Sequence, residues 1–362
     1  MKTSILNYKT EIIQTAAAAA VSVIYMIILT ICKSSSRIVE NIFVPIANYL
    51  SIPLKTVFGI FPFSVFEWFI LLLLPIAALI VFLFYRKYKN MSTLHFTLRA
   101  ITTVLLIAVI CYLIYGLLFG FAGYRLSMAQ SVFGSEPKPD AQKLYETSVY
   151  MALKASETRE AAASEKFDFS KISSELKKDY LKDSKNYSFL KLPVSNPKKV
   201  IFSKAMSYTD ITGIYFPVTA EANVNTNDLD FNLPFTMAHE MAHSAMVTRE
   251  AEANFTAFLI CSDSDDPLIR YSAYVNALTY SMNALYDTDK DKFNKLIPYI
   301  STGVIEDLRA QNNHWAKYNG VVADVSQKIN DAHIKISGQP AGVASYGKVT
   351  DLLIEWYSNR KS

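Results

Sequence analysis

His239, Glu240 and His243 form a His-Glu-x-x-His pattern within a stretch rich in alanine and methionine. Residues four apart on an α-helix lie on one face, with about 5–6 Å between their Cβ atoms. A single helix therefore lets both histidines bind one zinc ion, and it places Glu240 beside them as a general base for a water molecule. The chain contains only five histidines, so two at this spacing are hard to call incidental. The pattern predicts a site for one zinc ion per chain.

A catalytic zinc site needs a third protein ligand and keeps its fourth position open. On one continuous helix, Glu250 would lie on the same face as His243 but about 10 Å along the axis, too far to share the ion. Glu252 would lie on the opposite face. A helix break over residues 246–249 would let a second helix fold back and present a carboxylate. The alanines beside Glu252 favour a close approach, so Glu252 is the expected ligand, and Asn254 is expected to orient a ligand histidine.

This arrangement resembles the gluzincin zinc peptidases, and it is closest to their ImmA/IrrE-like branch, in which Glu-Ala-Asn follows the zinc motif on a second helix. The resemblance implies that Glu252 is the third zinc ligand. The chain as a whole resembles a bacterial family of uncharacterised three-span membrane proteins. The shared stretches are residues 221–225, 233–236, 239–243 and 345–347. Ala251 stands where the family pattern has Asp, and this departure leaves the expected ligands unchanged.

The segment before the motif predicts a substrate-binding strand. Residues 211–225 alternate apolar and polar side chains and read as one or two strands with a break at Pro217. Zinc peptidases commonly place an edge strand beside the motif helix, and an extended peptide can pair with such a strand. The expected substrate strand consists of Glu221, Ala222, Asn223, Val224 and Asn225. The donor that stabilises the oxyanion is left open among Tyr346, His314, His333 and Tyr215.

The remaining polar part of the chain predicts mostly helices. Pro234 suits the first turn of the motif helix. Helical spacing of apolar residues recurs at residues 141–157, 170–181, 250–261, 268–285, 290–299, 303–313 and 348–357, and in a long segment that ends near residue 333. Residues 199–202 add a short strand. We therefore expect residues 125–362 to form a mainly α (α+β), zincin-like soluble domain with a small β-sheet.

The first third of the chain predicts a membrane anchor. The sequence is 51% hydrophobic, and charge-free runs occupy about residues 12–32, 68–85 and 100–124. Each is long enough for a membrane span. The first run lacks a clear cleavage site, and further spans follow it, which favours a retained span over a signal peptide. Residues 37–63 read as a proline-interrupted loop along the membrane surface. Residues 1–124 are thus expected to form three transmembrane α-helices.

The basic residues predict the orientation. Arg86, Lys87, Lys89 and Arg99 form the densest set in a short loop, which the positive-inside rule places in the cytoplasm. Three spans then put the N-terminus in the cytoplasm and residues 125–362 outside it, in a multi-pass protein of the cell membrane. Lys33, Arg37 and Lys55 in the first loop argue the other way.

Composition limits the classes of partner and of metal site that the chain can have. The net charge is +4 and the basic residues are scattered, so nucleic acid is excluded as a partner. Three cysteines allow neither a disulfide framework nor a cysteine-based zinc cluster. We expect a membrane-anchored zinc metallopeptidase that acts on a peptide or protein, of unspecified oligomeric state. The alternative is a membrane receptor or assembly factor that keeps a zincin fold for binding only.

Overall fold

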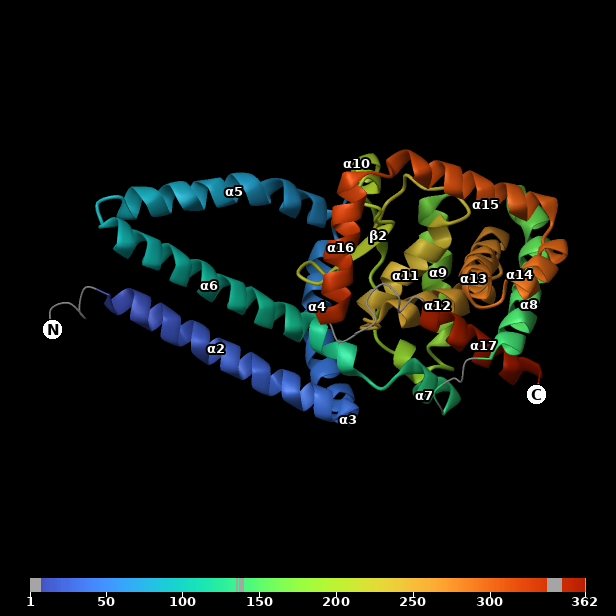
Figure 1. The fold of residues 1–362 in the computed structure, drawn as a ribbon, viewed down its shortest axis with the longest axis horizontal. Coiled ribbons are helices and arrows are strands. Elements are labelled where there is room, and N and C mark those ends of the chain that lie inside the picture. The colour runs from blue at the N-terminus through green and yellow to red at the C-terminus, as the bar shows by residue number, and fades with distance from the viewer. Residues whose placement is uncertain (1–7, 135, 137–139, 337–346, 362) are drawn as a thin grey trace.

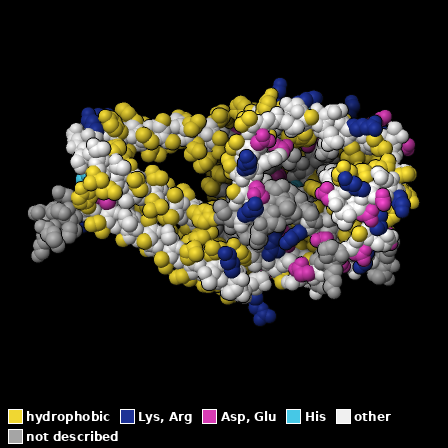
Figure 2. Space-filling model, in the orientation of Figure 1, with side chains coloured by type: hydrophobic (Ala, Val, Ile, Leu, Met, Phe, Trp, Pro, Cys, Tyr) yellow, Lys and Arg dark blue, Asp and Glu magenta, His cyan; other side chains and the backbone are white. Residues whose placement is uncertain are grey.

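The computed structural model describes residues 8–134, 136, 140–336 and 347–361 of the chain. Within these residues the protein is mostly helical and contains one three-stranded sheet. Three long helices extend to one side, most of the other helices form a body on the opposite side, and the strands lie in the part of that body nearest the long helices (Figure 1). Hydrophobic side chains cover the three long helices, whereas charged side chains gather mainly on the helical body (Figure 2).

The long helices confirm that the N-terminal part of the chain has the character of a membrane protein. They are α2 (Lys9–Ser34), α5 (Val65–Tyr88) and α6 (Thr93–Leu118). Beyond the three expected helices, the continuous helical stretch Ser36–Gly59 is also long and apolar enough to cross a membrane. The chain therefore has four such helices among its described residues.

The additional stretch replaces the predicted proline-interrupted loop over residues 37–63. It consists of α3 (Ser36–Ile38), the π-helical turn η1 (Val39–Phe43) and α4 (Val44–Gly59). Pro45 lies in the first turn of α4, where a missing N–H costs little, and Pro53 is accommodated inside the helix. In Figure 1, α4 runs across the ends of α2, α5 and α6 instead of alongside them.

The helices α2 and α6 pack along each other, while α5 diverges from them and leaves an opening in the space-filling view (Figure 2). The pair carries polar contacts along its length. Arg99 was expected in the basic loop, but it lies in α6, where its Nε donates to Glu11 of α2 at 2.5 Å. Gln14 of α2 bonds to Thr102 and Thr103 of α6.

The sheet has the strand order β1–β3–β2, with β1 Pro197–Lys199, β2 Gly213–Phe216 and β3 Glu221–Val224. The first strand lies slightly before the predicted 199–202, and the segment 211–225 forms the two expected strands. β3 pairs in parallel with β1 and antiparallel with β2. The central strand is therefore β3, and the two edges are β1 and β2.

The predicted helices of the polar part are present, with ends that differ by a few residues. They are α8 (Ala141–Ala163), α9 (Phe169–Asp183), α11 (Leu233–Ser244), α12 (Glu250–Ser262), α13 (Pro267–Thr288), α14 (Lys290–Leu296) with η4 (Ile297–Tyr299), α15 (Thr302–Trp315), α16 (Val321–Ile336) and α17 (Gly347–Lys361). Short helical elements that were not predicted are η2 (Gly120–Tyr124), α7 (Met128–Phe133), η3 (Ser188–Leu190), α10 (Ser203–Ser207) and η5 (Ala316–Tyr318).

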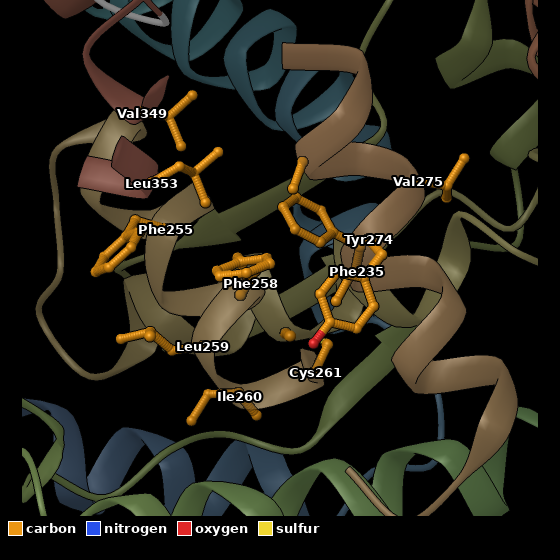
Figure 3. Packing of buried hydrophobic residues seen from close by; sticks show 14 of the residues in the cluster. Phe235, Phe255, Phe258, Leu259, Ile260, Cys261, Tyr274, Val275, Val349 and Leu353 are labelled. Carbon is orange, nitrogen blue, oxygen red and sulfur yellow. The ribbon is translucent and has the colours of Figure 1, made fainter. Parts of the chain in front are cut away.

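The core of the helical body lies around α12. Its apolar side chains contact α11, α13 and α17, and Phe258 packs between Tyr274 and residues of α17 (Figure 3). Because α12 is apolar on most of its surface and buried over nearly its whole length, its position is fixed from several sides. This packing holds the first turn of α12 against α11, the helix that carries His239, Glu240 and His243.

Two buried carboxylates, Glu221 and Glu67, attach the sheet to α5. Glu221 of β3 accepts hydrogen bonds from the N–H groups of Val65 and Phe66, which begin α5. It also pairs with Lys198 of β1 at 2.6 Å, and both side chains are buried. In return, Glu67 of α5 accepts from the N–H groups that follow β1, at 2.7 Å each. These contacts fix α5 relative to the sheet on which α11 packs.

Candidate functional site

The motif helix α11 ends in a sharp reversal of the chain, at the place where a helix break was expected. Met246 has a left-handed backbone, with φ +63°. Its N–H donates to His243, and the N–H of Val247 donates to Ala242, which is the Schellman pattern of helix ends. Glycine usually occupies this position, but the Met246 side chain is fully buried in a cluster with apolar residues of α2, η1, α4 and η2 and stabilises the reversal through packing. The predicted break over residues 246–249 is thus present.

The reversal brings a carboxylate back to the two histidines. The Nε2 atoms of His239 and His243 lie 3.3 and 3.5 Å from the two carboxylate oxygens of Glu250, the first residue of α12. Ligand atoms around a tetrahedral zinc ion, with bonds of about 2.0–2.1 Å, lie about 3.3 Å apart. The three side chains therefore have the spacing and the chemical types of a zinc ligand set.

The structure places Glu250, and not Glu252, in this cluster. The two residues differ by two positions in α12, so their side chains point in directions roughly 200° apart around the helix. The Glu252 carboxylate accepts from Arg249 at 2.6 Å and from the N–H of Met128 at 2.9 Å. Glu252 was expected from the alanines beside it and from the Glu-Ala-Asn resemblance, and neither determines which way the first turn of α12 faces.

The ring of His243 is oriented by the reversal itself. Its Nδ1 lies 2.7 Å from the carbonyl oxygen of Val247. A carbonyl only accepts, so Nδ1 carries a proton, and Nε2 is the ring nitrogen that faces Glu250. The Nδ1 of His239 is buried without a partner among the described residues. Asn254, the expected orienting residue, is buried one helical turn after Glu250 on the same face of α12.

Glu240 lies against the edge strand β2. A Cβ atom at Gly213 would come within 2.5 Å of the Glu240 Oε1, so the strand backbone approaches this carboxylate very closely. The N–H of Tyr215 also bonds to the Glu240 carboxylate, and Oε2 is buried without a partner in the described part of the chain. This carboxylate, with Oε2 free of described partners, lies next to two histidines and the edge of β2 that faces away from β3, which are the surroundings of a general base.

The charges in the cluster are strongly coupled. Burial raises the pKa of Glu240 to about 7, in spite of the neighbouring histidines. Burial alone would lower the pKa of His243, but the Glu250 carboxylate outweighs it and raises this pKa to about 9. Burial would likewise raise the pKa of Glu250, but the two histidines hold it well below its usual range. Glu250 is therefore ionised, as a metal ligand must be.

Among the residues left open as oxyanion donors, Tyr215 lies closest to this arrangement. Its ring packs on Phe119, which in turn contacts the edge of His243. Its hydroxyl is buried and has no partner among the described residues. His314 instead contacts the carbonyl oxygen of Asn227 at 2.7 Å. Tyr346 and the side chain of His333 lie outside the described residues.

The expected substrate strand is not an edge. Residues 221–224 form β3, which is paired on both sides, and residue 225 follows it. All five residues, Glu221, Ala222, Asn223, Val224 and Asn225, are buried. An incoming peptide therefore finds no open N–H and C=O groups along β3. The strand next to Glu240 with an outer edge is β2, which the sequence pattern could not order relative to β3.

Comparison with known proteins identifies a family. Residues 43–354 match the family described as "Protein of unknown function (DUF3810)". No curated protein matches the chain, and no solved structure does either. The match covers most of the chain and includes α4 to α6, the sheet, α11 and α12. The chain belongs to the DUF3810 family.

Proposed function

We propose that this protein is a membrane-anchored zinc metallopeptidase. The observation that carries the proposal is the convergence of His239, His243 and Glu250 at distances that suit one zinc ion, directly beside the buried Glu240. Two ligands come from one helix, and the third comes from the next helix after a reversal, as in the gluzincin pattern that the sequence resembles. Zinc, when bound, supplies a Lewis acid that polarises a peptide carbonyl and acidifies water.

The side chains divide the remaining chemistry among them. Glu240 accepts the proton of the attacking water and passes it to the leaving amine. Its burial suits both steps, because a carboxyl group with a pKa near 7 exchanges protons readily at neutral pH. Val247 keeps His243 in the tautomer that leaves Nε2 free. The Tyr215 hydroxyl is the donor that we assign to the developing negative charge on the substrate.

The substrate pairs with β2. This strand is an edge of the sheet, and its Tyr215 N–H already reaches the Glu240 carboxylate. An extended peptide along this edge forms main-chain hydrogen bonds and places a scissile bond near Glu240. The absence of a side chain at Gly213 allows β2 to lie this close to Glu240, since a Cβ atom at Gly213 would occupy the space of the Glu240 carboxylate.

The site lies outside the cytoplasm in this proposal. Three helices, α2, α5 and α6, cross the bilayer, and α4 lies along its outer surface. The crosswise direction of α4 in Figure 1 supports this assignment. So does Lys55 of α4, whose Nζ donates to carbonyl oxygens of Pro193 and Ser244 in the helical body. The loop with Arg86, Lys87 and Lys89 is then cytoplasmic.

Metal analysis of two glutamine variants tests the ligand set. Glu250→Gln replaces an anionic ligand by a neutral amide, so the purified protein should lose its stoichiometric zinc. Glu252→Gln is the matched control, because it changes the same residue type two positions away, and it should keep one zinc per chain. Loss of zinc in Glu252→Gln with retention in Glu250→Gln would overturn the assignment.

Glu240→Gln tests the reaction. It should keep zinc and lower the turnover of a mixed fluorogenic peptide library by about 10²–10⁴-fold, the usual worth of a general base. Wild-type protein with full zinc that cleaves no member of the library would contradict the peptidase proposal. That outcome would favour a protein that binds peptides without cutting them.

A further inference from the structure

A basic cavity lies apart from the histidine cluster, where α4 meets the sheet and α9. Its volume is about 320 Å³, and its lining includes Lys55, Thr56 and Gly59 of α4, Lys177 of α9, and Lys198 of β1. A second hollow of about 450 Å³ shares Lys177 and Lys198 with it. The two hollows form one continuous basic surface from the membrane helix α4 to the helical body.

The charges of this cavity are not balanced by the described part of the chain. Glu221 is the acidic residue in its lining, and its carboxylate is committed to Lys198, to two backbone N–H groups and to Thr219. Lys55 donates to two neutral carbonyl oxygens and forms no ion pair with a described residue. Lys177 likewise forms no ion pair there. An ammonium group has three donors, so Lys55 keeps one N–H for a ligand.

The surroundings of the cavity indicate how a ligand arrives. Ile52 lies in the cavity lining and is 43% exposed, and the exposed Tyr49 lies three positions before it on α4. A cavity with two unbalanced ammonium groups beside a lipid-facing apolar surface suits an amphiphile with an anionic end. Phosphate suits this site because its oxygens accept charge-assisted hydrogen bonds from ammonium groups.

We propose that this cavity binds a phosphate-bearing anion, presented as the headgroup of an anionic phospholipid of the membrane in which α4 lies. The headgroup phosphate contacts Lys55 and Lys177, and the acyl chains lie along the apolar face of α4. Lys55 also donates to the carbonyl oxygen of Ser244, the last residue of the motif helix α11, at 2.8 Å. The bound lipid would therefore hold α4 against the end of the helix that carries the histidines.

Gly59 offers a clean perturbation of the cavity. A Cβ atom at this position meets no atom within 4 Å, so a larger side chain projects into open space without a clash. Gly59→Glu places a carboxylate in the basic cavity, and Gly59→Gln adds the same volume without charge. Lys177→Gln removes one of the proposed contacts from an exposed position, and Lys185→Gln is its control on an exposed lysine outside the lining.

The experiment uses the delipidated full-length protein in neutral detergent and measures lipid adducts by native mass spectrometry. Dioleoyl phosphatidylglycerol should bind wild type, Gly59→Gln and Lys185→Gln alike, at least tenfold more weakly to Gly59→Glu, and several-fold more weakly to Lys177→Gln. Dioleoyl phosphatidylcholine should bind at least tenfold more weakly to wild type. Equal phosphatidylglycerol binding by wild type, Gly59→Glu and Lys177→Gln would overturn the proposal, as would equal binding of the two lipids.

Inorganic phosphate distinguishes the sources of the ligand. Millimolar phosphate should displace phosphatidylglycerol only weakly, because it lacks the contacts of the acyl chains with α4. Complete displacement at that concentration, lost in Gly59→Glu, would support the anion site but assign it to a soluble phosphate. Unfolding temperature and zinc content of each variant serve as folding controls, and Lys177→Gln decides the outcome if Gly59→Glu does not fold.

Discussion

Gly213→Ala tests the placement of the edge strand against the general base. The added Cβ atom would lie 2.5 Å from the Oε1, 2.7 Å from the Cγ and 2.8 Å from the Cδ of Glu240, whereas ordinary contact begins at 3.4 Å. One of the two groups must therefore move by about 0.9 Å. Glu240 is buried between β2 and its own helix, so the carboxylate cannot simply rotate into solvent.

The expected loss of activity in Gly213→Ala follows from this displacement. A misplacement of about 1 Å costs roughly 10²-fold in the rate of a positioned catalytic group, which corresponds to about 2.7 kcal/mol in the activation free energy. Gly213→Ala should therefore lower kcat for a cleaved library peptide by about 30–100-fold. His239, His243 and Glu250 are not among the nearest neighbours of the added atom, so zinc content should be unchanged.

The assay combines steady-state peptide hydrolysis with metal analysis and thermal unfolding. Gly59→Ala is the matched control, because the same substitution there meets no atom within 4 Å and should leave all three measurements unchanged. Wild-type turnover in Gly213→Ala would refute the close approach of β2 to Glu240. Loss of zinc in this variant would show that the strand supports the ligands and not the base.

Three further predictions concern stability and topology. Burial raises the pKa of Asp183 to about 6 from an ordinary value near 4, so the folded protein binds this proton more tightly than the unfolded chain does. The stability that comes from this tighter proton binding is fully present below pH 4 and is lost as the pH rises through 6. Asp183→Asn should therefore raise the unfolding temperature at pH 8 but not at pH 4. Glu221→Gln leaves Lys198 buried without its counterion and should destabilise the protein by about 3–5 kcal/mol in denaturant unfolding, whereas adding Lys198→Met should recover part of the loss. Alkaline phosphatase fused after Ser362 should be active and green fluorescent protein dark; the opposite pattern would place the histidine cluster in the cytoplasm.

Much of the architecture is predictable because its signals are local. Apolar runs of membrane length, helical spacing around Phe258 and the proline at the start of α11 each depend on neighbouring residues. The helix α4 was missed because Pro45 and Pro53 read as breaks. One lies in a first turn, where proline is tolerated, and the other is accommodated inside the helix.

The site was predictable only in part, because its geometry depends on one reversal. His239, Glu240 and His243 follow from helix periodicity. The choice between Glu250 and Glu252 depends on the direction in which α12 starts, which the left-handed Met246 determines. One local signal was available: Asn254 follows Glu250 by four positions, one helical turn, so these two share a face. The order of β2 and β3 depends on long-range pairing, which alternation does not encode.

The contact between Glu221 and the start of α5 has a consequence for biosynthesis. Val65 and Phe66 leave the ribosome more than 150 residues before the carboxylate that receives their N–H groups. During that interval the end of the inserted helix depends on water or lipid headgroups for hydrogen bonds. This end of α5 receives its final hydrogen-bond acceptor only when β3 takes its place in the sheet and Glu221 meets Lys198. The junction between α5 and the sheet thus forms late, only after the residues on both of its sides have been synthesised.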